Sequence, residues 1–361
     1  MSPTAIELLK ELIKWKSVLG TEGEIASFIY HLIEPYSSEI YYQDLGDGRK
    51  NVIAFGSGKK ERCILLNAHM DTVEVMKNWS VDPFAGVEAD GKIFGLGACD
   101  MKAGLAIFLL LFAEFSEKLN IIFTACADEE GESLGAFQLI NHLKEKGISP
   151  DLVLISEPTN ERLMMGARGR VVFKIEVYGR SAHGARPNLG INAVVDCGRI
   201  AGIFEDMPVG EHEKLGRGSF CPLLISGQSD SLSVPEFCKL VVDRHYVLGE
   251  KPEVIKREIE NRILALGLRS KVNVGYVKRS VPFLKPYVTH ENNLVEEFMK
   301  TVNAEITYGQ SVGDFNLFGE NWPTVVYGVA GGNWHAADEF VYADSLARVE
   351  KKYREFFERM L

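Results

Sequence analysis

Residues 120–133 read NIIFTACADEEGES, an apolar run that ends in three adjacent acids. The run NIIFTACA has the length and composition of a buried strand. The acids Asp128, Glu129 and Glu130 repel one another unless positive charge lies among them. Two interpretations are open: the acids begin a helix over 133–147, since a helix N-terminus favours negative charge, or they bind a metal ion.

The segments on either side of this stretch alternate between strand and helix patterns. Strand patterns lie at 50–56, 63–68, 120–127, 151–156 and 324–329. Helical patterns lie at 3–15, 22–34, 100–117, 133–147, 291–304 and 344–360. Short apolar strands separated by helices predict an α/β fold with a mostly parallel sheet that is covered on both faces.

The pattern changes after residue 167, where strands alternate in polarity and two of them follow one another directly. In chain order, the strands and helices there are 171–179, 190–205, 219–227, 238–248, 251–267 and 270–278. The order strand-helix-strand-strand-helix-strand is that of the ferredoxin-like unit. We therefore predict a discontinuous α/β domain, 1–167 and 280–361, with a ferredoxin-like α+β domain inserted at 168–279.

Composition narrows the class of protein. The chain has 361 residues, of which 46% are hydrophobic and 25% charged, as in ordinary globular proteins. The net charge of −10 and the lack of a basic cluster argue against a nucleic-acid partner. The most apolar run, 105–115, is about half of the ~20 residues that span a bilayer, so no membrane contact is expected. Six scattered cysteines and an N-terminus without signal-peptide features predict a cytoplasmic location.

Acids and histidines follow the predicted parallel strands at their carboxyl ends, where open α/β sheets bind ligands. The residues that this rule brings together, with Asp100 at the start of the 100–117 helix, are His69, Asp71, Asp100, Asp128, Glu129, Glu130, Glu157 and His335. Imidazole nitrogens and carboxylate oxygens without thiolates are a donor set for hard or borderline metal ions. The sequence therefore predicts a metal site at this edge of the sheet.

Two spacings within this set indicate separate roles. On extended backbone His69 and Asp71 point to the same side, so the carboxylate of Asp71 can fix the imidazole tautomer. The side chains of Glu129 and Glu130 diverge, so one can hold metal while the other acts as general base. Alone, each short motif has an ordinary explanation, and Asp100 alone is typical of a helix N-cap. Their joint occurrence at consecutive strand ends favours the metal site.

Two residues of the inserted domain stay ambiguous on sequence alone. His183 lies in a loop with Ser181 and Arg186, and is either an ordinary loop histidine or a site residue. Arg244 has an ordinary interpretation as a surface strand cation that pairs with Asp243.

Six motifs, taken together, resemble the co-catalytic zinc aminoacylase/carboxypeptidase family. It includes acetylornithine deacetylase, succinyl-diaminopimelate desuccinylase, acyl-lysine deacylases and glutamate carboxypeptidases. The motifs are NAHMDTV, GLGACDMKAGLA, ACADEEGES, SEPTN, GRSAHGARP followed by GINAV, and HAADEF. They run through nearly the whole chain in the family's order, and they are specific for the family rather than for a substrate.

The resemblance implies a centre of two divalent metal ions. The implied ligands are His69 and Glu157 for one ion, Glu130 and His335 for the other, and Asp100 as the bridge. The resemblance further implies that Glu129 is the general base and that Asp71 orients His69. Zinc is the expected metal, and cobalt and manganese are the alternatives.

The resemblance also implies roles outside the metal centre. His183 would come from a lid and dimerisation domain and help hold the oxyanion, in dimeric relatives from the partner subunit. A homodimer is therefore expected. Arg244 matches an arginine of relatives that meets the substrate carboxylate. The chain departs from the family at Leu232, where relatives carry asparagine. It departs again at GQSVGDFNLFG, where deacylases carry GTSD, so Asp314 is an approximate counterpart for substrate binding.

The expected function is hydrolysis of a small-molecule amide: removal of an acyl group from an N-acyl amino acid by metal-activated water. A metallo-carboxypeptidase or dipeptidase with the same centre is the alternative, with a short peptide as substrate. A binding protein without activity is the competing class, and loss of the base or of a ligand would mark it. The base, the orienting acid and the five ligands are all present, which argues against that class. They are Glu129, Asp71, His69, Asp100, Glu130, Glu157 and His335.

Overall fold

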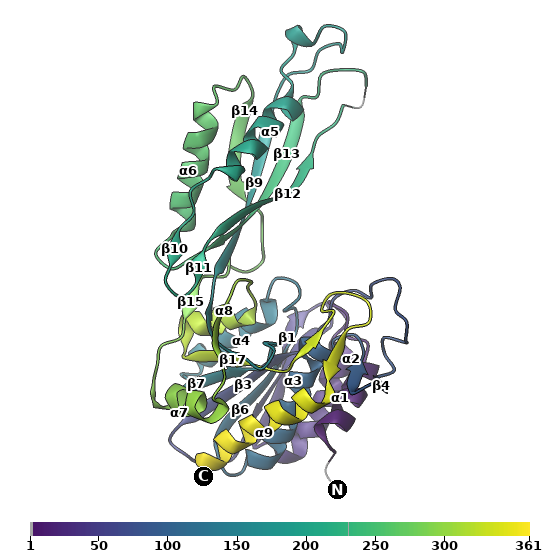
Figure 1. Cartoon of the computed structure of the whole chain (residues 1–361), viewed down its shortest axis with the longest axis vertical. Helices are drawn as coiled ribbons and strands as arrows, with labels where there is room; N and C mark the ends of the chain where they lie inside the picture. The colour runs from purple at the N-terminus through teal and green to yellow at the C-terminus, as the bar shows by residue number, and fades with distance from the viewer. Residues whose placement is uncertain (1–2, 230) are drawn as a thin grey trace. The chain divides into compact units, whose positions relative to one another are not determined.

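The protein, described here from a computed structural model covering residues 3–229 and 231–361, divides into two compact units (Figure 1). Unit 1 consists of residues up to 166, 288–308 and 313–361, and unit 2 of 167–287 and 309–312. Unit 2 extends beyond the predicted 168–279 because its first strand and the residue before that strand bind later segments. The N–H of Arg170 donates to Leu284 O at 2.8 Å, and that of Arg168 to Gly309 O at 3.1 Å.

Unit 1 is built on a nine-stranded sheet in the order β1-β2-β6-β3-β7-β17-β8-β15, with β16 paired to β8. The strands are β1 Glu39–Gly46, β2 Arg49–Phe55, β3 Cys63–His69, β6 Asn120–Cys126, β7 Leu152–Ile155, β8 Leu163–Ala167, β15 Tyr287–Val288, β16 Ile306–Gly309 and β17 Thr324–Tyr327. Strands β6, β3, β7 and β17 are parallel, whereas β1, β2 and β8 add antiparallel pairings. The predicted mostly parallel α/β sheet is confirmed.

Helices cover both faces of this sheet (Figure 1). They are α1 Ala5–Lys14, α2 Gly23–Ile33, α3 Ala103–Phe115, α4 Leu134–Glu145, α7 Asn293–Val302, α8 Asp314–Asn321 and α9 Ala343–Arg359, and a 3₁₀ turn lies at Glu34–Tyr36. The connections β3-α3-β6 and β6-α4-β7 run in opposite directions across the sheet, so right-handed crossovers place α3 and α4 on opposite faces.

Helix α3 is buried almost all round because α1 and α9 pack on it from outside while β3 and β6 lie beneath it. Its continuous apolar sequence, which lacks the usual amphipathic stripe, follows from this position. Over the part of the chain that the structure describes, no helix combines the length and hydropathy needed to cross a bilayer.

A second, smaller sheet in unit 1 has the order β18-β19-β5-β4. Its strands are β4 Val87–Ala89, β5 Lys92–Phe94, β18 Gly331–Gly332 and β19 Phe340–Tyr342. Antiparallel pairing of β19 with β5 and β18 brings the segment before β19 beside the segment after β5. These short strands were not predicted, and they carry the two loops that hold His335 and Asp100.

Unit 2 is an antiparallel sheet in the order β12-β13-β9-β14, with two helices packed on it. The elements are β9 Gly169–Tyr178, α5 Ala193–Gly202, β12 Ser219–Ser226, β13 Phe237–Tyr246, α6 Pro252–Ala265 and β14 Lys271–Tyr276. A hairpin, β10 Glu211–His212 and β11 Gly216–Arg217, and 3₁₀ turns at Pro187–Leu189 and Ile203–Glu205 complete it. This chain order with this strand order is the ferredoxin-like arrangement, as predicted.

Candidate metal centre

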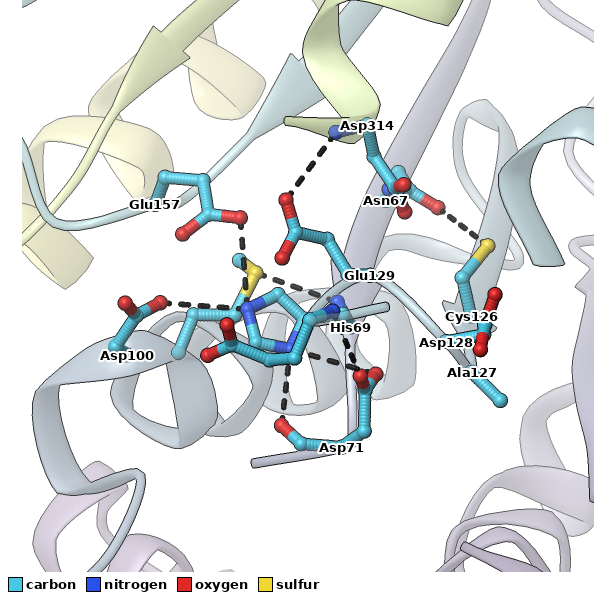
Figure 2. A network of polar contacts seen from close by, with 12 residues as sticks. Asn67, His69, Asp71, Asp100, Cys126, Ala127, Asp128, Glu129, Glu157 and Asp314 are labelled. Carbon is cyan, nitrogen blue, oxygen red and sulfur yellow. Dashed lines mark hydrogen bonds and ion pairs between the residues drawn. The ribbon is translucent and has the colours of Figure 1, made fainter. Parts of the chain in front are cut away.

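Three neighbouring parallel strands deliver side chains to one point at their carboxyl ends (Figure 2). His69 is the last residue of β3 and lies in register with Cys126, the last residue of β6. Glu129 follows β6, and Glu157 follows β7 on the other side of β3. The parallel register therefore brings residues from three separate segments together, as the strand-end rule predicts.

Asp100 lies between two histidines. Its Oδ1 is 3.3 Å from His69 Nε2, and its Oδ2 is 3.5 Å from His335 Nε2. Asp100 belongs to an irregular turn, Ala98–Lys102, with φ −112° and ψ 95°, and α3 begins only at Ala103. The interpretation of Asp100 as an N-cap is therefore wrong, and its carboxylate is directed to the imidazoles instead.

Two further carboxylates complete the contacts of the histidines. Glu130 Oε1 is 3.0 Å from His335 Nε2, and Glu157 Oε1 is 3.5 Å from His69 Nε2. Two groups of ligand atoms lie within 4.8 Å of one another: His69 with Glu129 and Glu157, and His69 with Asp100 and Glu130. The structure thus brings the five predicted ligands together.

Asp71 contacts both His69 and the turn that carries Glu130. The Nδ1 atom of His69 lies 3.0 Å from the backbone O of Asp71 and 3.6 Å from its Oδ1, so the carbonyl is the nearer acceptor. The Oδ2 atom of Asp71 accepts the backbone N–H of Glu130 at 2.9 Å. This pairing leaves Nε2 of His69 for the metal side, and it ties the imidazole to the turn that carries Glu130.

The three adjacent acids have different surroundings: the helix-start interpretation fits Asp128, and metal binding by the other two stays a prediction. Asp128 pairs with Arg49, Oδ1 to Nη1 at 2.7 Å, and its Oδ2 accepts the N–H of Leu134 at 3.0 Å at the start of α4. Asp128 is therefore a structural acid of the helix start. Glu129 and Glu130 are the two acids that face the centre.

Glu129 has no histidine partner at hydrogen-bond distance among the contacts described. Its Oε1 accepts the backbone N–H of Asp314, the first residue of α8, at 3.3 Å. Burial and the nearby charge of Glu157 raise the pKa of Glu129 well above its usual value. Asp314 is only 2% exposed, and burial raises its pKa to about 7. The contact with the site that the structure shows is the N–H of Asp314 to Glu129 (Figure 2), and substrate binding by its carboxylate stays a prediction.

The electrostatics of the metal-free protein fit a cationic ligand. Burial raises the pKa of Glu157 to about 8. Hydrogen bonds with Asp100 and Glu130 raise the pKa of His335 to about 10. Burial opposes the ionisation of Asp100, but hydrogen bonds from His335 and His69 outweigh it and hold its pKa below its usual range. More carboxylates than imidazoles converge here, and every donor is an N or O ligand of zinc-type sites.

The predicted residues of unit 2 fare differently. His183 is exposed, and its Nδ1 accepts the N–H of Ala185 at 3.1 Å, so its role stays a prediction. Arg244 has no exposed surface: its Nη2 lies 2.5 Å from Glu250 Oε1, and its guanidinium stacks over Phe220 at 4.6 Å. The interpretation as a surface cation paired with Asp243 is wrong. Its charge is enclosed and paired with Glu250, and its contact with the substrate carboxylate stays a prediction.

One buried acid at the centre was not predicted. Glu339 accepts the backbone N–H groups of Gly97 at 2.7 Å, Cys99 at 2.9 Å and Asp100 at 3.0 Å. The motif HAADEF contains Glu339 four residues after His335, and an acid so close to a predicted ligand histidine is the signal that could have indicated it. Its partners are more than two hundred residues away in sequence, which is why the motif alone does not disclose them.

The sheet with histidine and carboxylate donors at its carboxyl edge, and a separate carboxylate beside them, defines a metal-dependent hydrolase. The model for peptidase family M20/M25/M40 matches residues 65–359, and the chain belongs to that family. It is accordingly a metallohydrolase that acts on amide or peptide bonds.

The chain is similar to one curated enzyme over its full length, and it shares its fold with solved structures. The chain is 29% identical over 389 residues to the succinyl-diaminopimelate desuccinylase of Wolinella succinogenes, covering 100% of both chains. A solved tripeptidase from Staphylococcus aureus has a TM-score of 0.81 at 19% identity, with 98% of this chain and 97% of that chain covered. A Bacillus subtilis protein described as a dinuclear metal-binding peptidase of the M20 family has a TM-score of 0.71 at 16% identity, with 99% and 97% covered.

Proposed function

We propose that the chain is a dinuclear metal-dependent amidohydrolase that removes an acyl group from an N-acyl amino acid. The observation that carries this proposal is the position of Asp100, whose two oxygens face two different imidazoles. A carboxylate in that position is suited to bridge two cations. The full-length relationship to a desuccinylase supports a small acyl amino acid as the substrate.

A peptidase with the same centre is the second candidate. The tripeptidase and the dinuclear peptidase among the solved relatives share the fold over nearly the whole chain, and their names describe cleavage of peptides. Both reactions hydrolyse an amide next to an amino-acid side chain, so they differ in the pocket and share the centre.

The proposed ligands divide into two sets joined by one bridge. They are His69 and Glu157 for one ion, Glu130 and His335 for the other, and Asp100 for both. When bound, the two ions supply Lewis-acid polarisation of the scissile carbonyl and a water of lowered pKa. Zinc suits these nitrogen and oxygen donors, and cobalt and manganese are the alternatives.

Glu129 acts as the general base in this proposal. It takes a proton from the attacking water and delivers it to the leaving amine, a role that calls for a carboxylate whose pKa lies well above that of a surface acid. Burial beside Glu157 supports such a pKa for Glu129. The N–H of Asp314 holds one of its oxygens, which leaves the other to meet the water.

Unit 2 serves as lid and dimerisation domain in this proposal. His183 helps hold the developing oxyanion, as the family resemblance implies. Strand β12 is an edge strand whose consecutive residues Leu223, Leu224 and Ile225 are all exposed. Because unpaired apolar edges favour association, we propose a homodimer through β12. Light scattering of wild type and Leu224→Lys tests it: the wild type elutes as a dimer and the variant as a monomer, and a monomeric wild type contradicts it.

A paired substrate panel tests the function. After reconstitution with Zn²⁺ or Co²⁺, hydrolysis is measured for N-acetyl and N-succinyl derivatives of ornithine, lysine, diaminopimelate, glutamate and methionine. Dipeptides that end in the same residues form the other half of the panel. We expect higher kcat/KM for an acyl derivative than for its dipeptide. The reverse preference establishes the peptidase, and no turnover on either half contradicts both candidates.

A further inference from the structure

A single buried side chain connects the loops of two proposed ligands. Glu339 is 2% exposed, and its two oxygens accept three backbone N–H groups from residues 97, 99 and 100. Its own backbone O accepts the N–H of Gly95 at 3.0 Å. The segment that ends in Asp100 is therefore attached to Glu339 through both its side chain and its main chain.

The other end of this connection is the loop of His335, between β18 and β19. That loop is closed on itself, because Asn333 Nδ2 donates to Asp338 O at 3.0 Å and the N–H of Ala336 donates to Asn333 O at 3.0 Å. His335 and Glu339 thus belong to one compact loop, and the distance between them is restricted.

From these contacts we infer that Glu339 is a positioning residue that sets the spacing between Asp100 and His335. It thereby sets the affinity for the second metal ion, the one proposed to bind at Glu130 and His335. The inference rests on the proposed dinuclear function and adds a residue outside its ligand set. The hydrogen bonds described for Glu339 all join it to backbone groups, so it acts through Asp100 and His335.

A glutamate suits this place for reasons of charge and geometry. Three N–H groups of one turn that converge on a point form a cradle for an anion, and two carboxylate oxygens accept all three. Lys102, also buried, adds an electrostatic attraction to Glu339. Replacement by a neutral or shorter side chain leaves buried N–H groups without acceptors, and the turn with Asp100 then loses its fixed position.

The test measures metal affinity directly, without substrate. Metal-free wild type, Glu339→Gln and Glu339→Asp are titrated with Zn²⁺ against a competing chromophoric chelator, and two dissociation constants are fitted for each. Outer-sphere changes at metal sites cost about 10–100-fold in affinity or activity, and we expect a loss of this size for the second ion in Glu339→Gln. Glu339→Asp keeps the charge, so its affinity for the second ion is expected to lie between that of Glu339→Gln and that of the wild type. Activity then falls in kcat, with KM nearly unchanged.

A matched control separates this effect from loss of stability. Asp196 is a buried carboxylate of unit 2 that accepts the N–H of Ser270 at 3.3 Å and its hydroxyl at 2.7 Å. Asp196→Asn is expected to lower the melting temperature while both zinc dissociation constants stay at wild-type values. Wild-type zinc affinity in a folded Glu339→Gln and Glu339→Asp overturns the inference. A wild type that binds no zinc overturns the proposed function instead, so the two failures are distinguishable.

Discussion

Buried charge is arranged differently around Arg244 in unit 2 and at the proposed metal centre of unit 1. In unit 2 enclosed charges have partners: Arg244 pairs with Glu250 at 2.5 Å, and Asp243 pairs with Arg170 at 2.8 Å. In unit 1 carboxylates from separate strand ends converge on two histidines, and burial raises the pKa of Glu157 to about 8. Arg49 pairs with Asp128, the acid next to Glu129 in the sequence.

This difference separates a structural from a functional use of ionisable side chains. Burying an ion pair removes both charges from water, which costs free energy. The attraction between the two charges and their hydrogen bonds must offset this cost. An uncompensated group of acids lowers stability until an external cation binds, so its presence indicates a ligand rather than a structural role. By this criterion Arg244 is a paired, structural charge, whereas Glu129 belongs to the acids of the proposed metal centre.

The largest expected effect comes from the carboxylate that has no partner among the ligands. Glu129→Gln keeps the shape of the side chain and removes its basicity, so we expect a loss of roughly 10²–10⁴-fold in kcat, as for other general bases. Metal content by plasma emission is expected to stay at the wild-type level. The exposed Glu117→Gln is the control, and full activity in Glu129→Gln contradicts the assignment of the base.

Breaking a compensated pair in unit 2 is expected to affect stability alone. Arg244→Met leaves Glu250 without its cation, which costs roughly 3 kcal/mol in unfolding free energy, measured by urea denaturation. Arg170→Met removes the cation of a pair whose arginine side chain is 35% exposed, and it is expected to cost less, about 1 kcal/mol. Zinc affinity stays unchanged in both. A tenfold loss of zinc affinity in Arg244→Met would show that the two units are coupled through this residue.

Supplying the missing charge is expected to stabilise unit 1. Zn²⁺ at a hundred times its dissociation constant raises the unfolding free energy by about 2.7 kcal/mol per site. Calorimetry of the chelator-treated and the reloaded protein measures this as a rise in melting temperature. In His335→Ala and Glu130→Ala the rise is expected to be smaller, because the second ion loses a ligand. A melting temperature independent of zinc in wild type contradicts the proposed centre.

A smaller effect concerns pH in the metal-free protein. Burial raises the pKa of Asp314 to about 7, so the folded state binds this proton more tightly than the unfolded state. Its stabilising contribution is complete below about pH 4 and is lost as the pH rises through 7. Asp314→Asn is expected to reduce the slope of stability between pH 5 and 7 by up to about 1.4 kcal/mol per pH unit. Identical slopes in urea denaturation would mean that Asp314 is ionised in the fold.

Several features of the site follow from local sequence. His69, Glu129 and Glu157 were predicted because each follows an apolar strand, and the parallel register brings the ends of β3, β6 and β7 together. Asp100 was predicted as a bridge on resemblance alone, whereas its alternative as an N-cap fails because Glu339 holds the backbone of its turn. The loops of Asp100 and His335 meet through β5 and β19, strands of three residues that carry too short a pattern to predict.

The sequence by itself determined the α/β class, the ferredoxin-like unit and the set of converging donors. The physical reason is that strand and helix periods, and the carboxyl ends of parallel strands, are properties of short contiguous segments. Only the tertiary structure decided which partner each of these charged groups has. Arg49 pairs with Asp128, and the N–H of Asp314 donates to Glu129. Glu250 pairs with Arg244. Glu339 accepts a hydrogen bond from the turn of Asp100. The contacts that distinguish the adjacent acids and hold the turn of Asp100 join residues distant along the chain, so a short segment of sequence does not disclose them.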